Sequence, residues 1–271
     1  MPELPEVETV VRDLRPLLVG RTIGAVRVGR HKLRSPWKPH WTPRVAGRRI
    51  DAIDRRGKWI LVRLAGDATL VLHLGMTGQL TVHPEPEPLA DHTHLRFPLD
   101  DGRELRFRDV RRFGSATLFA SPGTLAEHLN ARLGPEPFAL EPEYWFAALK
   151  GTTRCVKAVL LDQTVLAGVG NIYADESLFR AGVHPGRRAN TMTRTQAESL
   201  RCAVEVVLRR AIDGRGSTIR DYIGGSGLKG GFQEEFAVYG RTGQPCPACR
   251  TPIAVARHAG RSSHHCPRCQ K

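Results

Sequence analysis

Four cysteines near the end of the chain constrain its fold most. They form two Cys-x-x-Cys pairs, Cys246 with Cys249 and Cys266 with Cys269, separated by sixteen residues. Each pair is a turn that places two thiolates close together, and sixteen residues suffice for a hairpin that returns the second pair. Four thiolates complete the tetrahedral shell of Zn²⁺ with no open position, so we predict one structural zinc ion whose binding supplies the folding energy.

Two disulfides are the alternative reading of these cysteines. The chain opens with Met1-Pro2-Glu3-Leu4-Pro5-Glu6, which is acidic and lacks the basic and then apolar layout of a secretion signal. No apolar run approaches the ~20 residues that span a bilayer. We therefore expect a cytoplasmic protein, in which thiols stay reduced and zinc is favoured over disulfides. The two remaining cysteines, Cys155 and Cys202, are predicted to be buried and inert.

The charge balance indicates a polyanionic partner. The 41 Lys and Arg residues against 27 Asp and Glu residues give a net charge of +14, and phosphate contacts of such a chain would release condensed counterions. No acid follows Glu235, whereas that segment carries Arg241, Arg250, Arg257, Arg261, Arg268 and Lys271. A basic ribosomal protein or a membrane-surface protein would share this balance, so charge alone does not identify the partner.

Hydrophobic periodicity predicts an N-terminal helix followed by a β-rich region. Apolar residues recur at helical spacing over residues 5–18, and Gly20 ends the pattern. Short runs of β-forming residues, separated by Gly, Pro and Asp turns, then predict eight strands: 23–28, 49–54, 59–64, 69–74, 79–82, 94–98, 104–109 and 115–119. Closely spaced strands of this kind favour a sandwich or a barrel over βαβ units.

The pattern changes at the Pro-rich stretch 134–137. Beyond it, helical spacing covers residues 144–150, 155–162, 172–181 and 193–212, and a glycine-rich loop occupies 214–231. We therefore expect an α+β multidomain protein with three parts: an N-terminal helix and eight-stranded β-sandwich (1–134), a helical domain with the loop (135–235) and a zinc finger (236–271).

Pro2 and Glu3 are a candidate nucleophile and acid–base pair. Removal of Met1 would leave a secondary amine on Pro2, and an α-amino group titrates near ~7.7–8.0, so part of it is neutral and can attack carbon. Glu3 lies beside it and could transfer protons. Pro and Glu also open helices well without any chemistry, and the local residues alone favour that reading.

Three further motifs are ambiguous when each is read alone. Asn171 follows a glycine hairpin and occupies an expected N-cap position, where free N–H groups could hold a phosphate or simply begin a helix. The stretch 111–114, Arg-Arg-Phe-Gly, could push a ring into a duplex, or it could bury Phe113 under surface arginines. Lys58 and His73, at the ends of two predicted strands, are unremarkable alone.

Taken together, these pieces resemble the bacterial formamidopyrimidine-DNA glycosylases. The resemblance rests on matches in the family's order: Met1-Pro2-Glu3-Leu4-Pro5-Glu6-Val7-Glu8-Thr9, Arg56-Gly57-Lys58, His73-Leu74-Gly75-Met76, Arg111-Arg112-Phe113-Gly114, Gly168-Val169-Gly170-Asn171-Ile172-Tyr173-Ala174 and the four-cysteine finger. They span residues 2–269. The resemblance implies an N-terminal helix plus β-sandwich, a helix–two-turn–helix domain and a zinc finger.

The resemblance also implies an activity: a monomeric base-excision-repair enzyme of the cytoplasm and nucleoid. It would bind double-stranded DNA that contains an oxidised base or an abasic site, remove oxidised purines such as 8-oxoguanine and formamidopyrimidines, and cut the strand by β,δ-elimination as an AP lyase. By the same resemblance, Pro2 forms a Schiff base with C1′ of the flipped nucleotide and Glu3 protonates the opening sugar. Lys58 and Arg261 assist the eliminations and contact phosphates.

The family pattern assigns DNA contacts to further residues. His73 and Asn171 would hold the kinked backbone, with further DNA contacts from His92 and Tyr239. The gap left by the extruded base would be filled by Met76, Arg111 and Phe113. Glu6 and the loop 214–231 match the lesion-reading parts. The sequence departs from the family at Val110, often proline, and at 151–154, where a lysine of some members is absent, so Arg154 is the predicted phosphate contact.

Two alternatives remain open. An endonuclease VIII-type glycosylase for oxidised pyrimidines shares the terminal Pro-Glu and the finger, but its N-terminus usually reads Pro-Glu-Gly-Pro and it lacks the Arg-Phe wedge; Leu4 and Phe113 favour the purine enzyme. A non-catalytic zinc-finger protein that binds nucleic acid would account for the charge and the finger, but has no need of a freed Pro2 beside Glu3.

Overall fold

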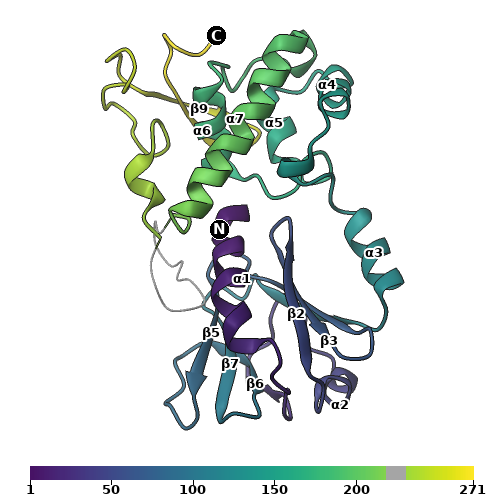
Figure 1. Ribbon diagram of the computed structural model, residues 1–271. Coiled ribbons are helices and arrows are strands. Elements are labelled where there is room, and N and C mark those ends of the chain that lie inside the picture. The colour runs from purple at the N-terminus through teal and green to yellow at the C-terminus, as the bar shows by residue number, and fades with distance from the viewer. Residues whose placement is uncertain (218–229) are drawn as a thin grey trace. The chain divides into compact units, whose positions relative to one another are not determined.

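The computed structural model describes residues 1–217 and 230–271, so most of the expected loop 214–231 lies outside the described residues. The chain forms two compact units (Figure 1). One comprises Met1–Asn130 and Gly214–Gly231, and the other comprises Ala131–Asp213 and Phe232–Lys271. Within the described ranges, no helix is both long and apolar enough to cross a membrane.

Helix α1 (Leu4–Leu18) begins the first unit. It confirms the predicted helix, which begins one residue earlier than expected. Its buried stripe includes Val7, Val10, Val11, Leu14 and Leu18. The helix packs against strands β2 (Ile50–Arg56), β3 (Trp59–Leu64) and β5 (Gly78–Pro84). Glu8 of α1 pairs with Arg55 of β2 at 3.0 Å and with Arg12 at 2.9 Å. Burial would raise the pKa of Glu8, but these hydrogen bonds lower it below its ordinary value.

All eight predicted strands exist and form two four-stranded antiparallel sheets. One sheet has the order β1-β6-β7-β5 and the other β2-β3-β4-β8. The strands are β1 (Arg27–Val28), β2 (Ile50–Arg56), β3 (Trp59–Leu64), β4 (Thr69–His73), β5 (Gly78–Pro84), β6 (Thr93–Pro98), β7 (Arg103–Asp109) and β8 (Ser115–Phe119). The first is much shorter than predicted, because Thr22 and Ile23 make only isolated bridges, to Arg49 and Leu99.

The two sheets share one apolar core with α1. Alternate residues of β6 and β7, such as Leu95, Phe97, Leu105 and Phe107, are at most 1% exposed and belong to the same cluster as the buried stripe of α1. Side chains of a strand alternate between its two faces, so these four lie on the face toward the apolar core. Two short helices that the periodicity did not predict, α2 (Thr42–Val45) and α3 (Pro122–Asn130), also belong to this unit.

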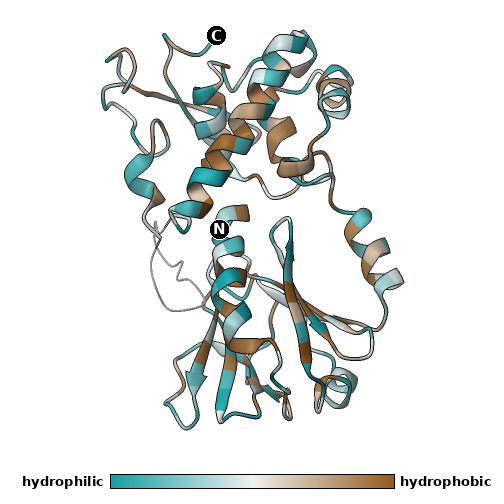
Figure 2. Cartoon of the chain, in the orientation of Figure 1, coloured by the Kyte–Doolittle hydropathy of each residue, from teal (hydrophilic) through white to brown (hydrophobic). Residues whose placement is uncertain are grey.

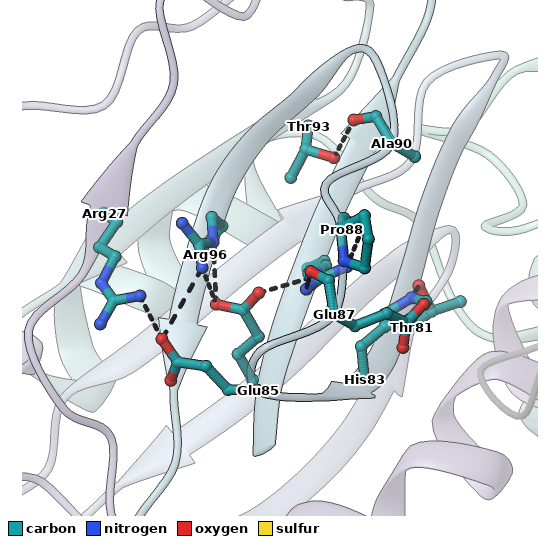
Figure 3. Close-up of polar contacts among 11 residues, drawn as sticks. Arg27, Thr81, His83, Glu85, Glu87, Pro88, Ala90, Thr93 and Arg96 are labelled. Atoms are coloured by element: carbon teal, nitrogen blue, oxygen red, sulfur yellow. Dashed lines mark hydrogen bonds and ion pairs between the residues drawn. The ribbon is translucent and has the colours of Figure 1, made fainter. Parts of the chain in front are cut away.

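The other face of the β6–β7 pair carries an ion network (Figure 3). Arg27 and Arg96 both approach Glu85, and Arg96 also pairs with Glu104 at 2.8 Å. Arg106 pairs with Glu104 and donates to the carbonyl of Pro88 at 3.0 Å. Glu104 is fully buried. Burial would raise the pKa of Glu104, but the arginine hydrogen bonds lower it. The network holds the segment after β5 against the sheet.

The second unit is helical, with a finger at its end. Its helices are α4 (Pro142–Lys150), α5 (Val156–Leu161), α6 (Asn171–Arg180) and α7 (Arg194–Asp213), and single 3-10 turns occur at Pro137–Ala139, Ala189–Thr191 and Phe232–Glu235. Helix α7 packs against α4 and α6. Hydrophobic and hydrophilic segments follow one another along α7 (Figure 2), as expected for an amphipathic helix, in which apolar residues recur every turn.

The finger is a two-stranded hairpin, β9 (Ala254–His258) and β10 (Arg261–His265). Its small core of Val238, Ile253, Cys246 and Cys266 is extended by Phe179 of α6. The finger therefore packs as part of the second unit.

The prediction that Cys155 and Cys202 are buried is wrong. Cys202 is exposed and Cys155 is partly exposed. The buried stripe of α7 runs through Leu200 and Val204, which leaves Cys202 on another face, where its thiol donates to Glu198 at 3.3 Å.

Candidate functional site

The start of α1 gathers three of the predicted site residues. Met1 is 51% exposed, whereas Pro2 is buried and Glu3 is 3% exposed. Glu3 is the N-cap of α1, and its N–H donates to Oε2 of Glu6 at 2.8 Å. The other oxygen of Glu6 accepts bonds from the N–H and the hydroxyl of Ser217. Glu6, itself 2% exposed, thus ties the helix start to the beginning of loop 214–231.

Lys58 and His73 lie at one end of a strand pair. Lys58 immediately precedes β3, and Trp59 is paired with His73, the last residue of β4. The pKa of His73 is lowered to about 4, chiefly by burial and also by the positive charges of Lys58 and Arg34. Nδ1 of His73 accepts the N–H of Gly75 at 3.0 Å. The ring is therefore neutral with its proton on Nε2, which leaves an N–H donor suited to a phosphate oxygen.

Two neighbouring loops expose apolar side chains. Met76, Val110 and Phe113 are 38%, 46% and 44% exposed. The guanidinium of Arg111 lies 4.7 Å from the ring centre of Phe113. Gly75 has φ +61°, and a Cβ there would lie 2.5 Å from the carbonyl carbon of Phe113, so only glycine permits this approach of the two loops. The alternative of a buried Phe113 is excluded.

Asn171 and Arg261 are brought near one another in the second unit. The prediction that Asn171 is the N-cap of this helix is wrong: the N-cap of α6 is Gly170, and Asn171 is the first helical residue, so the helix begins one residue earlier than expected. Nδ2 of Asn171 donates to the carbonyl of Ser262 at 3.1 Å. Ser262 follows Arg261, which is exposed at the start of β10. An amide has two N–H donors, and one of them makes this bond.

A buried ion pair underlies this arrangement and was missed from the sequence. Lys157 and Asp175 are both fully buried and lie 2.6 Å apart. Nζ of Lys157 also donates to the carbonyl of Ser262 at 2.7 Å, and Asp175 accepts the N–H of His264 at 2.9 Å. The two charges thereby fix β10 to helices α5 and α6. The available signal was a charged residue within each apolar helical stripe.

Glu176 holds the segment that leads into the finger. Its carboxylate accepts the backbone N–H groups of Ala237, Val238 and Tyr239 at 2.8 to 3.0 Å. Burial raises the pKa of Glu176 although these three donors act to lower it. The ring of Tyr239 packs edge-on against His264, with the ring centres 5.0 Å apart.

Arg154 and His92, two other predicted DNA contacts, already make hydrogen bonds within the protein. Arg154 pairs with Asp162 at 2.9 Å, so a phosphate would have to compete with a carboxylate. His92 is exposed, with φ +66°, and its carbonyl accepts the N–H of Asp109 at 3.0 Å. Both side chains lie at the protein surface.

The four finger cysteines fit a zinc ion. Their sulfur atoms all lie within 4.8 Å of one another, with Cys246–Cys269 at 3.9 Å and Cys249–Cys266 at 3.4 Å. Sulfur atoms at ~2.3 Å from one tetrahedral zinc ion would be about 3.8 Å apart. The donor set is therefore that of one structural zinc with no position for substrate.

Family models match three parts of the chain. Residues 1–116 match the formamidopyrimidine-DNA glycosylase N-terminal domain, residues 133–222 match the H2TH domain of the same glycosylase, and residues 243–271 match a zinc finger found in FPG and IleRS.

Relatives match over the full length. The formamidopyrimidine-DNA glycosylases of Heliobacterium modesticaldum and Geobacillus kaustophilus are each 46% identical to this chain, with complete coverage of both sequences. Among solved structures, a Lactococcus lactis FPG mutant in complex with DNA containing Fapy-dG aligns with a TM-score of 0.93 at 34% identity, covering all of both chains. The FPG protein of Thermus thermophilus aligns with a TM-score of 0.87 at 45% identity, covering 99% of this chain and 98% of that one.

Proposed function

Because this chain belongs to the formamidopyrimidine-DNA glycosylase family, we propose that it removes oxidised purines from duplex DNA and then cleaves the strand. The observation that carries the proposal is the full-length match to relatives of that name at 46% identity. The solved Lactococcus lactis relatives are titled as complexes with Fapy-dG and with abasic-site DNA. The substrate of this chain would accordingly be a duplex with an oxidised purine or an abasic site.

The proposed reaction begins at Pro2 after Met1 is removed. The Pro2 nitrogen forms a bond to C1′ as the bond from C1′ to the base breaks, and the electrons of that bond leave with the base. The proton of the Pro2 nitrogen passes to the departing base. Glu3 then protonates O4′ as the bond from C1′ to O4′ breaks, and the nitrogen lone pair completes an iminium linkage between protein and DNA. Two eliminations, assisted by Lys58 and Arg261, then break the bonds to the 3′ and 5′ phosphates.

The remaining site residues are proposed to hold the DNA. His73 and Asn171 each offer an N–H donor for a phosphate, and Arg154, His92 and Tyr239 are proposed as further backbone contacts. The side chains that fill the vacated stack are proposed to be Met76, Arg111 and Phe113. Glu6 is proposed to help read the lesion, together with loop 214–231. The finger zinc supplies folding energy and takes no part in the chemistry.

We also propose the functional division into 1–134, 135–235 and 236–271, and a monomeric protein of the cytoplasm that associates with the nucleoid. Phosphate contacts explain such an association for a chain of net charge +14.

Borohydride trapping tests the proposal. The wild-type protein should become covalently linked to a duplex containing 8-oxoguanine, and Pro2→Gly, which loses the secondary amine, should lose most trapping and base release. Trapping on thymine glycol but not on 8-oxoguanine would identify a pyrimidine-specific enzyme. If no covalent adduct forms on either lesion, the alternative of a non-catalytic protein that binds nucleic acid would be favoured.

A further inference from the structure

A buried carboxylate lies between the two loops that expose Met76 and Phe113. Asp109 is the last residue of β7, is paired with Gly78 at the start of β5, and is fully buried. The loop that contains Met76 immediately precedes β5, and the turn that contains Phe113 immediately follows β7. Asp109 therefore stands at the point where the two loops leave one sheet.

Both oxygens of Asp109 are committed to these loops. Oδ1 accepts the hydroxyl of Thr77 and the N–H of Arg111. Oδ2 accepts the N–H of Gly114 at 2.7 Å. The N–H of Arg111 also donates to the hydroxyl of Thr77 at 3.0 Å. The carboxylate of Asp109, the hydroxyl of Thr77 and the N–H of Arg111 are therefore each bonded to the other two. The carboxylate thus bonds to the loop before β5 and to both ends of the turn after β7.

The backbone of Asp109 is fixed as well. Its N–H donates to the carbonyl of His92 at 3.0 Å, and its carbonyl lies 2.8 Å from Nε2 of His94 and accepts the N–H of Arg112 at 3.3 Å. Arg112 has φ +59°, which is uncommon for a residue other than glycine. A turn that contains such a residue needs support from its surroundings, and the bonds of Asp109 provide it.

We propose that Asp109 is the positioning residue that sets the spacing of the Met76 loop and the Arg111–Phe113 turn, so that both enter the DNA as one wedge. The inference rests on the proposed function, because it assigns the wedge to filling the space left by an extruded nucleotide. Asp109 touches no DNA in this scheme. It acts through Thr77, Arg111 and Gly114, and its effect is confined to substrates that must be unstacked.

A carboxylate is the side chain that this position needs. A carboxylate only accepts hydrogen bonds, and this one faces three donors: the N–H groups of Arg111 and Gly114 and the hydroxyl of Thr77. In Asp109→Asn the side-chain NH₂ would face an N–H or displace the Thr77 hydroxyl, and one buried donor would lose its acceptor. Thr77→Val removes the bridging hydroxyl while keeping the shape of the side chain. Both variants loosen the link without changing Met76, Arg111 or Phe113.

The test compares two substrates for each variant. Single-turnover release of 8-oxoguanine from a duplex requires extrusion, whereas borohydride trapping on a single-stranded abasic oligonucleotide requires no unstacking of a paired base. The ratio of the two rates should fall about tenfold in Asp109→Asn and in Thr77→Val, the amount expected for one lost buried hydrogen bond. The fluorescence change of 2-aminopurine placed beside the lesion should decrease in parallel.

Glu104→Gln is the matched control. Glu104 lies near the other end of the same strand, is as fully buried as Asp109, and bonds to Arg96 of β6 and Arg106 of β7 rather than to the two loops. Its loss should lower stability and leave the rate ratio within about twofold of wild type, since the site is about 17 Å along the strand from the wedge.

The outcomes separate this inference from the proposed function. An active wild-type protein whose ratio is unchanged in both variants overturns the role of Asp109 alone, as does an equal fall in Glu104→Gln. A wild-type protein that traps on neither substrate overturns the proposed function and this inference with it. If Asp109→Asn does not fold, Thr77→Val decides the question.

Discussion

Glu6 accepts two hydrogen bonds from Ser217, one from its N–H at 2.8 Å and one from its hydroxyl at 3.1 Å, although 211 residues separate them. The same carboxylate accepts the N–H of Glu3. One buried side chain therefore fixes both the segment that contains the proposed nucleophile and the first turn of loop 214–231. A change at Glu6 should affect both.

Glu6→Gln should destabilise the protein, because a buried amide replaces an acceptor-only group opposite several donors. We expect a loss of about 1–3 kcal/mol in the free energy of unfolding, and about 1 kcal/mol for Ser217→Ala, which keeps the backbone N–H. Urea unfolding measures both. The exposed Glu127→Gln serves as control, and an equal effect of the two glutamine variants would contradict the structural role of Glu6.

His73 should make stability depend on pH. Its native pKa of about 4 lies below the ordinary value of 6.5, so the unfolded chain takes up a proton first as the pH falls. The stability linked to the neutral ring is present above pH 6.5 and is lost between pH 6.5 and about 4, by at most about 3 kcal/mol. His73→Gln cannot titrate, so its Tm should fall less than that of wild type across this range.

The exposed His40→Gln is the control for His73. It should follow the wild-type pH profile. If the difference in Tm between wild type and His73→Gln stayed constant from pH 7 to pH 4, the low pKa of His73 would be refuted.

Lys157→Met should cost about 3–5 kcal/mol of unfolding free energy, because it leaves Asp175 buried without its cation. The carbonyl of Ser262 loses a donor at the same time, so DNA binding through Arg261 should also weaken. Arg194→Met removes an exposed pair with Glu143 and should cost less than about 1 kcal/mol. Chemical denaturation measures the unfolding free energy of both variants. Similar losses would show that the buried pair contributes no more to stability than the exposed pair.

Removal of zinc should unfold the finger while the β-sandwich stays folded, since Cys246 and Cys266 form part of the finger's own small core. Cys249→Ser should lower the bound zinc measured by mass spectrometry and weaken binding of lesion-containing DNA. Cys202→Ser, at an exposed thiol of α7, should change neither. Full zinc content in Cys249→Ser would refute the ligand assignment.

Local patterns in the sequence predicted the elements well where one physical rule dominates. The helical spacing of apolar residues in α1, the β-forming runs between turns and the spacing of the four cysteines each follow from a local pattern, and each is confirmed. Helix α3 was not predicted because only two of its nine residues, Leu125 and Leu129, are buried, which is too few to give a helical pattern. The environment of Cys202 was missed because an apolar neighbourhood in sequence does not say which face of a helix a residue occupies.

The connections between distant residues could not be read from the sequence. Nothing in the local pattern around Glu6 points to Ser217, and nothing around Lys157 points to Ser262. Such bonds depend on how strands and helices meet, which is decided by the packing of the whole unit. The individual roles of Pro2 and Arg261 rest on family membership, since the geometry alone fits a helix start and a surface arginine.

The first unit is made of two separate pieces of chain, Met1–Asn130 and Gly214–Gly231. During synthesis its sandwich leaves the ribosome long before the second piece exists. At ~5–20 residues per second, the 211 residues between Glu6 and Ser217 correspond to a delay of roughly 10 to 40 seconds. A nascent chain can therefore form the hydrogen bonds between Ser217 and Glu6 only near the end of translation.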